Sequence, residues 1–502
     1  MKVVLVAVPL INTRIPPLSI AMLAGQLKRD GHEVKSFDFN IESYWAVSDE
    51  LKTYWTYYKG FQWLDNTHFE TYIYPNIIGQ FIDGWCQRIL DEKPDIVGIS
   101  VTASPSGTKL AERLKQINPD IKIVIGGPAC SKIYNDERYL PSPIFDAVVH
   151  NEGELTISEL IKVYAEKNRI LPVPGASTYF KGFVADGGLR PPLMDLDVLP
   201  YPDFDDLKLD TYIDADAPES SRLELPFFSS RGCPARCNFC MDYKMWDTYY
   251  RQKSPKRIVA EMEYLTERYG AKNFMFIELI FNGHNKKMHE LAEELASKNH
   301  DYRFWGHGRI DPRLDLATLK LLEKAGFTHF IFGLESASTR VLKLMRKGYS
   351  AEAADRVLRD LRKTEIRCSV NIITGFPGEN WWDYFITILF VLKHREVISG
   401  PPGVCECNAT AGSDIFLYPE KFNIKLGEHE SYRNWSTLDG KNTLKVRLLR
   451  KEIMVWIFKH VKFNWCHPSQ KPPSFLKRTF LNFKNALKKR GMNKIAASTP
   501  HT

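Results

Sequence analysis

The feature that most constrains the fold is the alternation of short apolar strands with helical segments, which occurs in two separate stretches of the 502-residue chain. The first stretch covers residues 1–175 and the second covers residues 223–425. Strands that are buried on both faces are nearly continuous apolar runs, and parallel strands need helical crossovers between them. The alternation therefore predicts an α/β protein with two parallel sheets, each with its ligand site at the C-terminal ends of its strands.

The first stretch predicts a Rossmann-like domain with an aromatic insert at about residues 44–90. We expect strands at 3–8, 33–39, 95–100, 121–127 and from 147, and helices at 18–29, 108–116 and after 154. The insert carries thirteen Trp, Tyr and Phe residues. They could form an apolar wall of a ligand site, but a helical insert with its own small core is favoured because aromatic side chains dominate core burial.

The second stretch predicts a partial (β/α)6 barrel that is open on one side. We expect strands at 225–230, 273–279, 302–307, 328–333, 367–374 and about 404–409, and helices at 255–269, 286–298, 316–325, 338–345 and 380–394. The Pro-rich residues 176–222 are expected to form an inter-domain linker. Residues 426–502 are expected to form a basic helical C-terminal region.

Three cysteines follow the first predicted barrel strand at C-x3-C-x2-C spacing: Cys233, Cys237 and Cys240. A four-iron, four-sulfur cluster suits them better than zinc, because a structural zinc site takes four protein ligands and this loop supplies three. Two alternatives are a zinc site completed by a distant ligand and three unrelated reduced thiols.

The cysteine spacing resembles the signature of the radical S-adenosylmethionine (SAM) superfamily. The resemblance implies that the iron without a cysteine ligand binds the amino and carboxylate groups of SAM. Phe239 matches the aromatic residue typical of that loop, while Glu335-Ser336 and the Gly-Phe-Pro-Gly-Glu sequence at 375–379 resemble elements that contact SAM. The SAM-binding residues implied in this way are Phe239, Glu335, Ser336, Gly375 and Phe376. By themselves, the glycines and proline of 375–379 could equally mark the start of a helix.

Five short motifs of the first stretch resemble the cobalamin-binding domain that precedes the radical domain in cobalamin-dependent radical SAM enzymes. They are Pro16-Pro17-Leu18, Gly31-His-Glu-Val34, Gly98-Ile-Ser100, Gly126-Gly127 and Glu152-Gly-Glu154. The implied cobalamin-binding residues are Ser100, Thr102, Gly126, Gly127, Glu152 and Gly153. The chain has no D-x-H-x-x-G motif, so that motif supplies no histidine ligand to cobalt. On their own, the glycines could also serve ordinary tight turns.

The two resemblances together imply a class B radical SAM methyltransferase. Such an enzyme uses a 5′-deoxyadenosyl radical to take hydrogen from an unactivated carbon, which then receives a methyl group through methylcobalamin. Alternatives are a radical SAM cyclase, oxidase or rearrangement enzyme, and an iron–sulfur scaffold or sensor without catalysis. His307 and Arg309 are candidate catalytic residues at the third barrel strand, and Glu278 and Asn282 are placed similarly after the second.

The charge distribution and the number of cysteines limit which partners and which cellular compartment are expected. Residues 444–495 contain 14 Lys or Arg residues and one acid, Glu452, so the chain's net charge of +8 belongs to the tail and gives no support for nucleic-acid binding. We expect a small-molecule, natural-product or lipid substrate and an electron donor such as flavodoxin or ferredoxin. Nine unevenly spaced cysteines favour the reducing cytoplasm, and no apolar run is long enough to predict a membrane span.

The basic tail and the remaining cysteines leave two further questions. A helical cap over the barrel is favoured for the tail, and peripheral contact of residues 440–502 with an anionic membrane is the alternative. Cys405, Cys407 and Cys466 could bind a second cluster or supply a thiol, but buried structural thiols are favoured. The same structural role is expected for Cys86, Cys130 and Cys368.

Overall fold

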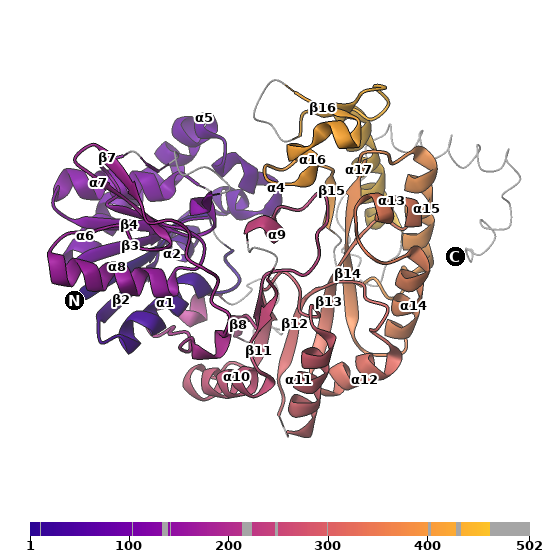
Figure 1. Ribbon diagram of the computed structural model, residues 1–502, viewed down its shortest axis with the longest axis horizontal. Coiled ribbons are helices and arrows are strands. Elements are labelled where there is room, and N and C mark those ends of the chain that lie inside the picture. Colours follow the sequence, from indigo (N-terminus) through magenta and orange to yellow (C-terminus); the bar gives the residue numbers. More distant parts are fainter. Residues whose placement is uncertain are drawn as a thin grey trace, which may run out of the picture. The chain divides into compact units, whose positions relative to one another are not determined.

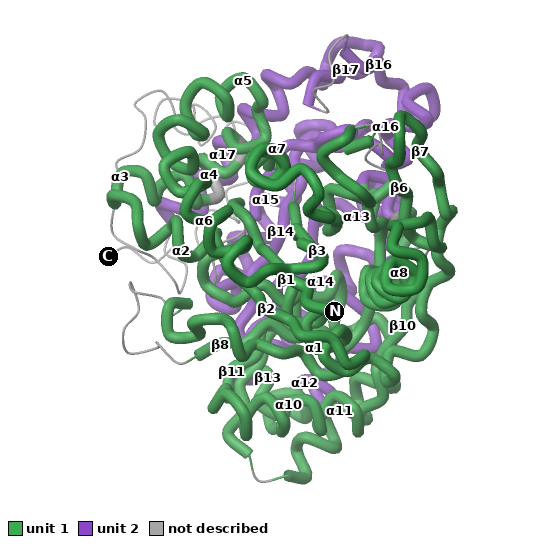
Figure 2. The backbone as a smooth tube through the Cα atoms, turned by 90° about the vertical axis from the view of Figure 1, so that its left-hand side faces the viewer, with its two compact units in different colours: residues 1–236, 240–308, 320–328 green, residues 237–239, 309–319, 329–502 purple. Residues whose placement is uncertain are grey.

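The computed structural model forms two compact units, which Figure 2 shows in different colours. Unit 1 contains residues 1–236, 240–308 and 320–328, and unit 2 contains residues 237–239, 309–319 and 329–502. The structure describes residues 1–10, 12–102, 104–132, 139–140, 142–212, 223–245, 249–298, 300–399, 403–427 and 433–461. The first strands of the predicted barrel thus belong to the same compact unit as the N-terminal sheet.

The N-terminal sheet confirms the Rossmann-like prediction (Figure 1). Within the described residues it has seven strands in the order β2-β1-β3-β4-β5-β6-β7. The strands are β1 Lys2–Ala7, β2 Glu33–Asp38, β3 Ile96–Ser100, β4 Lys122–Gly126, β5 Ala147–Val149, β6 Ala176–Phe180 and β7 Phe183–Asp186. The first five pair in parallel, whereas β6 and β7 join the edge in antiparallel fashion. Helices α1 (Leu18–Arg29) and α8 (Glu154–Lys167) pack together, as do α6 (Gly79–Asp91) and α7 (Ser106–Ile117).

The sheet continues beyond residue 175, where we expected the linker to begin. Strand β7 has four exposed residues, and β6 contains Ser177 and Thr178, so neither strand has the apolar run that marks a buried parallel strand. Strand β7 is the edge strand of the sheet, and β6 lies between β5 and β7. The rest of the connector includes η7 (Leu196–Val198) and η8 (Leu209–Tyr212).

The connector after β7 packs on unit 1 rather than crossing solvent. Asp203 accepts a hydrogen bond from Lys28 of α1 at 2.8 Å, and Asp206 accepts one from Lys35 at 2.7 Å. The ring of Tyr201 stacks on that of Tyr264 with centroids 4.7 Å apart. The acidic run that suggested an exposed linker is therefore neutralised by lysines of the N-terminal domain.

The aromatic insert is helical, but it does not have a separate core. It contains the end of α2 (Phe39–Ala46), α3 (Asp49–Lys52), η1 (Thr53–Trp55), α4 (Tyr57–Gly60), η2 (Phe61–Trp63), α5 (Asn66–His68), the π-helical η3 (Phe69–Ile78) and nearly all of α6. Trp63, Phe69 and Trp85 are buried in one cluster with Val4 and Val6 of β1. The expected small core is in fact an extension of the core of the sheet.

The second sheet confirms the partial barrel. Among the described residues it has six strands in the order β15-β14-β13-β12-β11-β8. They are β8 Glu224–Phe227, β11 Asn273–Phe276, β12 Arg303–Gly308, β13 Phe327–Glu335, β14 Arg367–Thr374 and β15 Gly403–Glu406. The pairings of β11 with β8 and β12, and of β14 with β13 and β15, are parallel. The sixth strand therefore exists, although it ends at Glu406.

The barrel helices match the predicted pattern with one addition. They are α10 Pro255–Tyr269, α11 Asn285–Ser297, α12 Leu316–Lys324, α13 Thr339–Leu344, α14 Ala351–Leu361 and α15 Trp381–Lys393. Helix α14 was not predicted. Its signals are present in the sequence: Ser350 caps the N-terminus, and Ala354, Val357, Leu358 and Leu361 form a buried stripe at helical spacing.

The C-terminal region is only partly helical in the described residues. After α16 (Asp414–Leu417) and η10 (Pro419–Phe422), the short strands β16 (Ile424–Leu426) and β17 (Trp435–Thr437) form an antiparallel pair. Helix α17 (Leu444–His460) follows and packs against β14 and β15. Cys466 and the rest of the predicted helical region from residue 462 onward lie outside the described residues. In the part of the chain that is described, no helix is both long and apolar enough to cross a membrane.

Candidate active site

The cysteine loop is closed at its base by two short antiparallel strands, β9 (Ser230–Arg231) and β10 (Arg251–Gln252). Helix α9 (Asp242–Met245) lies within the loop. Gly232 has a φ of +85°, and a Cβ atom at this position would collide with the carbonyl oxygen of Tyr249. A glycine is therefore required directly before Cys233 for the loop to leave the sheet as it does.

The three cysteines fit an iron–sulfur cluster better than a single-ion site. None is in a disulfide; Cys237 is buried, while Cys233 and Cys240 are half-buried. Among the described residues, no three His, Cys, Asp or Glu side chains are placed to hold one metal ion. A structural zinc site takes four protein ligands, whereas in a four-iron cluster each cysteine binds a different iron. The three-cysteine loop therefore suits the cluster better than a structural zinc site.

The middle of the cysteine loop is fixed by contacts within unit 2. The backbone N–H of Asn238 donates to the Met345 carbonyl at 3.1 Å, and its side-chain amide donates to the Leu344 carbonyl at 2.7 Å. Phe239 packs against an apolar cluster that contains Phe376. Two of the predicted SAM residues are thus brought together by side-chain packing.

Glu335 ends strand β13 in an unusual backbone conformation. Its φ is +60°, and the pairing of β13 with β14 shifts register between Gly333 and Glu335. The side chain is buried, and its Oε1 lies 3.3 Å from Lys347 Nζ. Burial raises the pKa of the Glu335 carboxyl, with Lys347 opposing the shift. A left-handed conformation of a non-glycine residue beside a buried charge is typical of functional sites.

Ser336 uses its hydroxyl within the fold. Its Oγ lies 3.2 Å from Thr387 Oγ1 and accepts a hydrogen bond from the Ser338 N–H at 3.1 Å. The residue is completely buried. These contacts place Ser336 at the start of the segment that leads into α13, and they identify no partner outside the protein.

The Gly-Phe-Pro-Gly-Glu sequence forms a tight turn between β14 and α15. Gly375 has a φ of +76°, and a Cβ atom there would collide with the Arg447 side chain. Its N–H donates to Glu379 Oε2 at 2.6 Å, so the turn is closed by its own glutamate. Phe376 is completely buried.

A cavity of about 390 Å³ opens within unit 1 at the C-terminal ends of its strands. Five of the six predicted cobalamin residues line it: Ser100, Gly126, Gly127, Glu152 and Gly153. The sixth, Thr102, is not among the lining residues, and its hydroxyl donates to the Leu10 carbonyl at 2.6 Å. Most of the remaining lining is apolar, and the glycines expose backbone to the cavity. This position is where doubly wound sheets bind their ligands.

Two segments of the barrel also line the cavity. They are the residues just before Cys233, namely Phe228, Ser230, Arg231 and Gly232, and the segment 277–279. The predicted cobalamin site and the base of the cysteine loop therefore share one cavity within unit 1.

The Glu152-Gly-Glu154 motif pairs with two arginines of that loop base. Arg231 contacts Glu154 and lies 3.5 Å from Glu152, and Arg251 lies 2.6 Å from Glu152. Burial alone would raise the pKa of Glu154, but Arg231 outweighs it and holds that pKa below its ordinary value. The motif therefore joins the N-terminal domain to the cysteine loop. Sequence reasoning missed both arginines, although Arg231 directly precedes the Gly-Cys pair.

Of the other candidate residues, Glu278 has the most unusual environment. It lines the cavity, and its Oε1 accepts a hydrogen bond from Ser229 Oγ at 2.5 Å. Its Oε2 is buried without a hydrogen-bond partner among the described residues, and burial raises the pKa of the carboxyl to about 7. Arg309 donates to the Lys347 carbonyl, and burial lowers the pKa of His307. Neither of these two lines the cavity.

The remaining described cysteines fit the structural role. Burial raises the pKa of Cys405 to about 12, and that of Cys407 rises further for the same reason. Burial also raises the pKa values of Cys86 and Cys368 to about 12. Burial of these thiols among apolar neighbours is what a structural role would produce.

Comparison with known proteins supports the same two domains. The Radical SAM superfamily model matches residues 227–391, and the B12 binding domain model matches residues 62–161. The uncharacterized methyltransferase PH0819 of Pyrococcus horikoshii is 28% identical over 406 residues, which is 78% of each chain. The anaerobic magnesium-protoporphyrin IX monomethyl ester cyclase of Rubrivivax gelatinosus is 32% identical over 58% of this chain, and this chain spans only 53% of the cyclase.

A solved structure shares the fold at lower identity. The radical SAM methyltransferase TsrM from Kitasatospora setae superimposes with a TM-score of 0.62 and 17% identity, covering 86% of this chain and 79% of that chain. Fold, cysteine loop and both domain matches agree. The chain is an enzyme that contains a radical SAM domain at residues 227–391 and a B12 binding domain at residues 62–161. Its cofactors are a four-iron, four-sulfur cluster, SAM and cobalamin.

Proposed function

We propose that this enzyme is a methyltransferase that modifies an unactivated carbon of a small-molecule substrate. The observation that carries the proposal is the shared cavity of unit 1, which is lined by the predicted cobalamin residues and by Arg231 and Gly232 at the base of the cysteine loop. A methyl group held in this cavity would lie near the cluster loop. Such proximity is what a methyl transfer to a substrate radical requires.

The candidate site residues form three sets, which would hold the cluster, SAM and cobalamin. Cys233, Cys237 and Cys240 would bind the cluster. Phe239, Glu335, Gly375 and Phe376 would bind SAM, with Ser336 supporting the turn into α13. Ser100, Gly126, Gly127 and Gly153 would face cobalamin. When bound, these groups supply one-electron cleavage of SAM and a transferable methyl group.

The protein's own contribution is placement, exclusion of water and control of charge. Lys347 compensates the buried carboxylate of Glu335, which can accept hydrogen bonds from the ammonium or hydroxyl groups of a ligand. The apolar lining of the cavity excludes water from a reactive radical. Glu278 can hold or release a proton at Oε2 near neutral pH, because its pKa is about 7.

Anaerobic reconstitution of the full chain tests this proposal. With SAM, a strong reductant and a panel of candidate acceptors, we expect 5′-deoxyadenosine and a product that carries labelled methyl from SAM. Cys233→Ala, Cys237→Ala and Cys240→Ala should each abolish 5′-deoxyadenosine formation, whereas Cys405→Ala should not. Iron binding without any SAM cleavage would instead support the scaffold or sensor alternative.

A second candidate function is a radical reaction without methyl transfer. The 32% identity to the Rubrivivax gelatinosus cyclase favours this alternative over other non-methylating reactions. The two candidates differ in one product: a cyclase or oxidase would form 5′-deoxyadenosine but no methylated product. Tracing the labelled methyl group therefore separates them.

We propose a reducing, cytoplasmic setting with a flavodoxin- or ferredoxin-type electron donor, since the cluster must be reduced before each SAM cleavage. Membrane contact through residues 440–502 stays a prediction. In the described part of this tail, α17 buries Met454, Ile457 and Phe458 against the protein, which supports the cap. Equal co-sedimentation with anionic liposomes of the full chain and of a chain ending at residue 461 would exclude a membrane role for residues 462–502.

A further inference from the structure

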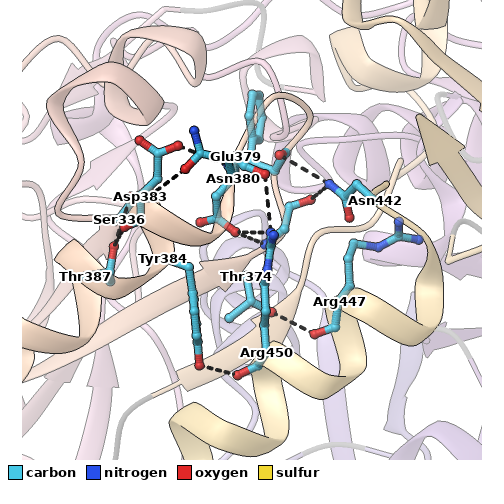
Figure 3. A network of polar contacts seen from close by, with 12 residues as sticks. Ser336, Thr374, Glu379, Asn380, Asp383, Tyr384, Thr387, Asn442, Arg447 and Arg450 are labelled. Atoms are coloured by element: carbon cyan, nitrogen blue, oxygen red, sulfur yellow. Dashed lines mark hydrogen bonds and ion pairs between the residues drawn. The ribbon is translucent and has the colours of Figure 1, made fainter. Parts of the chain in front are cut away.

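Helix α17 lies beyond the matched radical SAM region, which ends at residue 391, yet it contacts the turn assigned to SAM. Figure 3 shows the contact: the Arg450 side chain projects from α17 toward Glu379, and the backbone carbonyl of Arg447 accepts a hydrogen bond from Thr374. Both arginine side chains are buried. Helix α17 therefore buries two charged side chains in addition to the apolar Met454, Ile457 and Phe458.

Arg450 is connected to the turn through Glu379. Its Nη1 donates to Glu379 Oε2 at 2.8 Å, and only 3% of the Arg450 side chain is exposed. The same Oε2 accepts the N–H of Gly375 at 2.6 Å. One carboxylate oxygen therefore joins the guanidinium of α17 to the first residue of the Gly-Phe-Pro-Gly-Glu turn.

Two further contacts from the same segment reach the same turn. Asn442, just before α17, donates from its side-chain amide to the Gly375 carbonyl at 2.9 Å. The Arg447 carbonyl accepts a hydrogen bond from Thr374 Oγ1 at 3.2 Å, and the Arg447 side chain fills the space beside Gly375. Residues 374 and 375 are thus held at a backbone N–H, a backbone carbonyl and a side-chain hydroxyl.

The buried ion pair is informative because it is costly. Removing an arginine and a glutamate from water carries a desolvation penalty that their attraction often only balances, so such a pair adds little stability over an apolar pair. What the pair provides is a defined geometry at the carboxylate, since the hydrogen bonds to Glu379 have preferred directions. The geometry is imposed on the residues that begin the turn.

We propose that Arg450 is a positioning residue that, through Glu379, fixes the Gly375–Phe376 turn in the conformation that binds SAM. The inference rests on the proposed role of that turn. Helix α17 thereby sets the affinity of the enzyme for SAM, although neither Arg450 nor Glu379 needs to touch SAM.

The test compares Arg450→Met with Lys445→Met in the reconstituted full chain. Both substitutions remove one positive charge from α17, but Lys445 is exposed. We expect Arg450→Met to raise the KM and Kd for SAM by at least about tenfold, the usual consequence of losing a hydrogen bond between charged groups. The kcat for 5′-deoxyadenosine formation should change by less than about threefold, because the lost contact orders the bound turn rather than the reacting atoms. Lys445→Met should match the wild type.

A rescue variant separates positioning from a general loss of structure. Arg450→Met leaves the Glu379 carboxylate buried without its cation, whereas Arg450→Met/Glu379→Gln keeps an oxygen that can accept the Gly375 N–H. The double variant should therefore recover most of the lost SAM affinity. Should Arg450→Met not fold, Asn442→Ala removes the donor to the Gly375 carbonyl from outside the ion pair and should raise the KM for SAM in the same way.

Two outcomes would overturn the inference. The first is an unchanged KM for SAM in Arg450→Met or, where that variant does not fold, in Asn442→Ala. The second is a raised KM that the double variant leaves uncorrected. If the wild type itself neither binds nor cleaves SAM, the proposed function fails along with the inference. If the wild type cleaves SAM and the variants match it, the inference alone fails.

Discussion

Two buried ion-pair clusters hold two different parts of the candidate active site, one in each compact unit. In unit 1, Glu152 and Glu154 face Arg231 and Arg251 at the base of the cysteine loop. In unit 2, Glu379 faces Arg450 beneath the SAM turn. The pKa of Glu154 lies below its ordinary value, whereas burial raises that of Glu379 to about 7 despite Arg450.

The difference follows from the charges around each acid. Lys253 assists Arg231 in lowering the pKa of Glu154, whereas Asp383 adds a second negative charge near Glu379. In the first cluster, Glu154 is therefore ionised at neutral pH. In the second cluster, burial raises the pKa of Glu379 to about 7. Similar residue pairs thus hold an ionised carboxylate in one unit and a carboxyl that titrates near neutral pH in the other.

Arg231→Met should give the largest effect on stability. It leaves the buried carboxylate of Glu154 and the half-buried one of Glu152 with one arginine, and breaking a buried ion pair from one side costs about 3–5 kcal/mol. Anaerobic urea denaturation of the apo-protein at neutral pH measures the change. Lys286→Met is the control, because Lys286 is 82% exposed on α11 of the same unit. A loss in the free energy of unfolding no larger than that of the control would show that the unit 1 cluster contributes little to stability.

Glu379→Gln should change the pH dependence of stability. The pKa of Glu379 is higher in the folded state, about 7, than the ordinary value of 4.5, so the folded state binds the proton more tightly. Its stabilising contribution is therefore present below pH 4.5 and lost as the pH rises to about 7, by at most about 3 kcal/mol. The variant should lack this decline in denaturation experiments over that range.

Glu154→Gln should change the stability at acidic pH instead. The pKa of Glu154 is lowered in the folded state, so its contribution is present above its ordinary value of 4.5 and lost as the pH falls below it. The variant should therefore flatten the acid side of the stability profile, and Glu379→Gln the neutral side. Identical profiles for the two variants would contradict the contrast between the clusters.

Arg450→Met should destabilise the protein less than Arg231→Met, by about 1–3 kcal/mol at neutral pH, because Glu379 can take up a proton when its cation is lost. The cost should grow as the pH rises above about 7, since the uncompensated carboxylate must then ionise. Denaturation at two pH values on either side of 7 measures this increase. A cost that is the same at both values would indicate that Glu379 does not titrate there.

Apolar patterning was sufficient to predict much of the fold. The parallel strands of both sheets were expected because each buried parallel strand is a short apolar run, and the cysteine loop was placed correctly after β8. Strands β6 and β7 were missed because Ser177 and Thr178 interrupt the apolar pattern of β6 and because β7 has only four residues, and α14 was missed although its buried stripe is regular. The apolar pattern of β6 and β7 is weak, whereas that of α14 is clear in the sequence and was overlooked.

The two ion-pair clusters could not be predicted from the sequence. Arg231 and Glu154 are 77 residues apart, and Arg450 and Glu379 are 71 residues apart. Periodicity tells which residues are buried by hydrophobicity, but not which buried acid meets which arginine. The tail's positive charge suggested a solvated or membrane-facing surface for α17, whereas Arg447 and Arg450 are buried.

The most direct test of the central claim is the amount of 5′-deoxyadenosine released from SAM by the reconstituted, reduced full chain, compared with Cys237→Ala. Cys237 is the buried cysteine of the loop, so its loss should remove one cluster ligand. The account predicts release by the wild type and none by the variant. A wild-type protein that holds iron and SAM but releases no 5′-deoxyadenosine, or a variant that releases as much as the wild type, would contradict it.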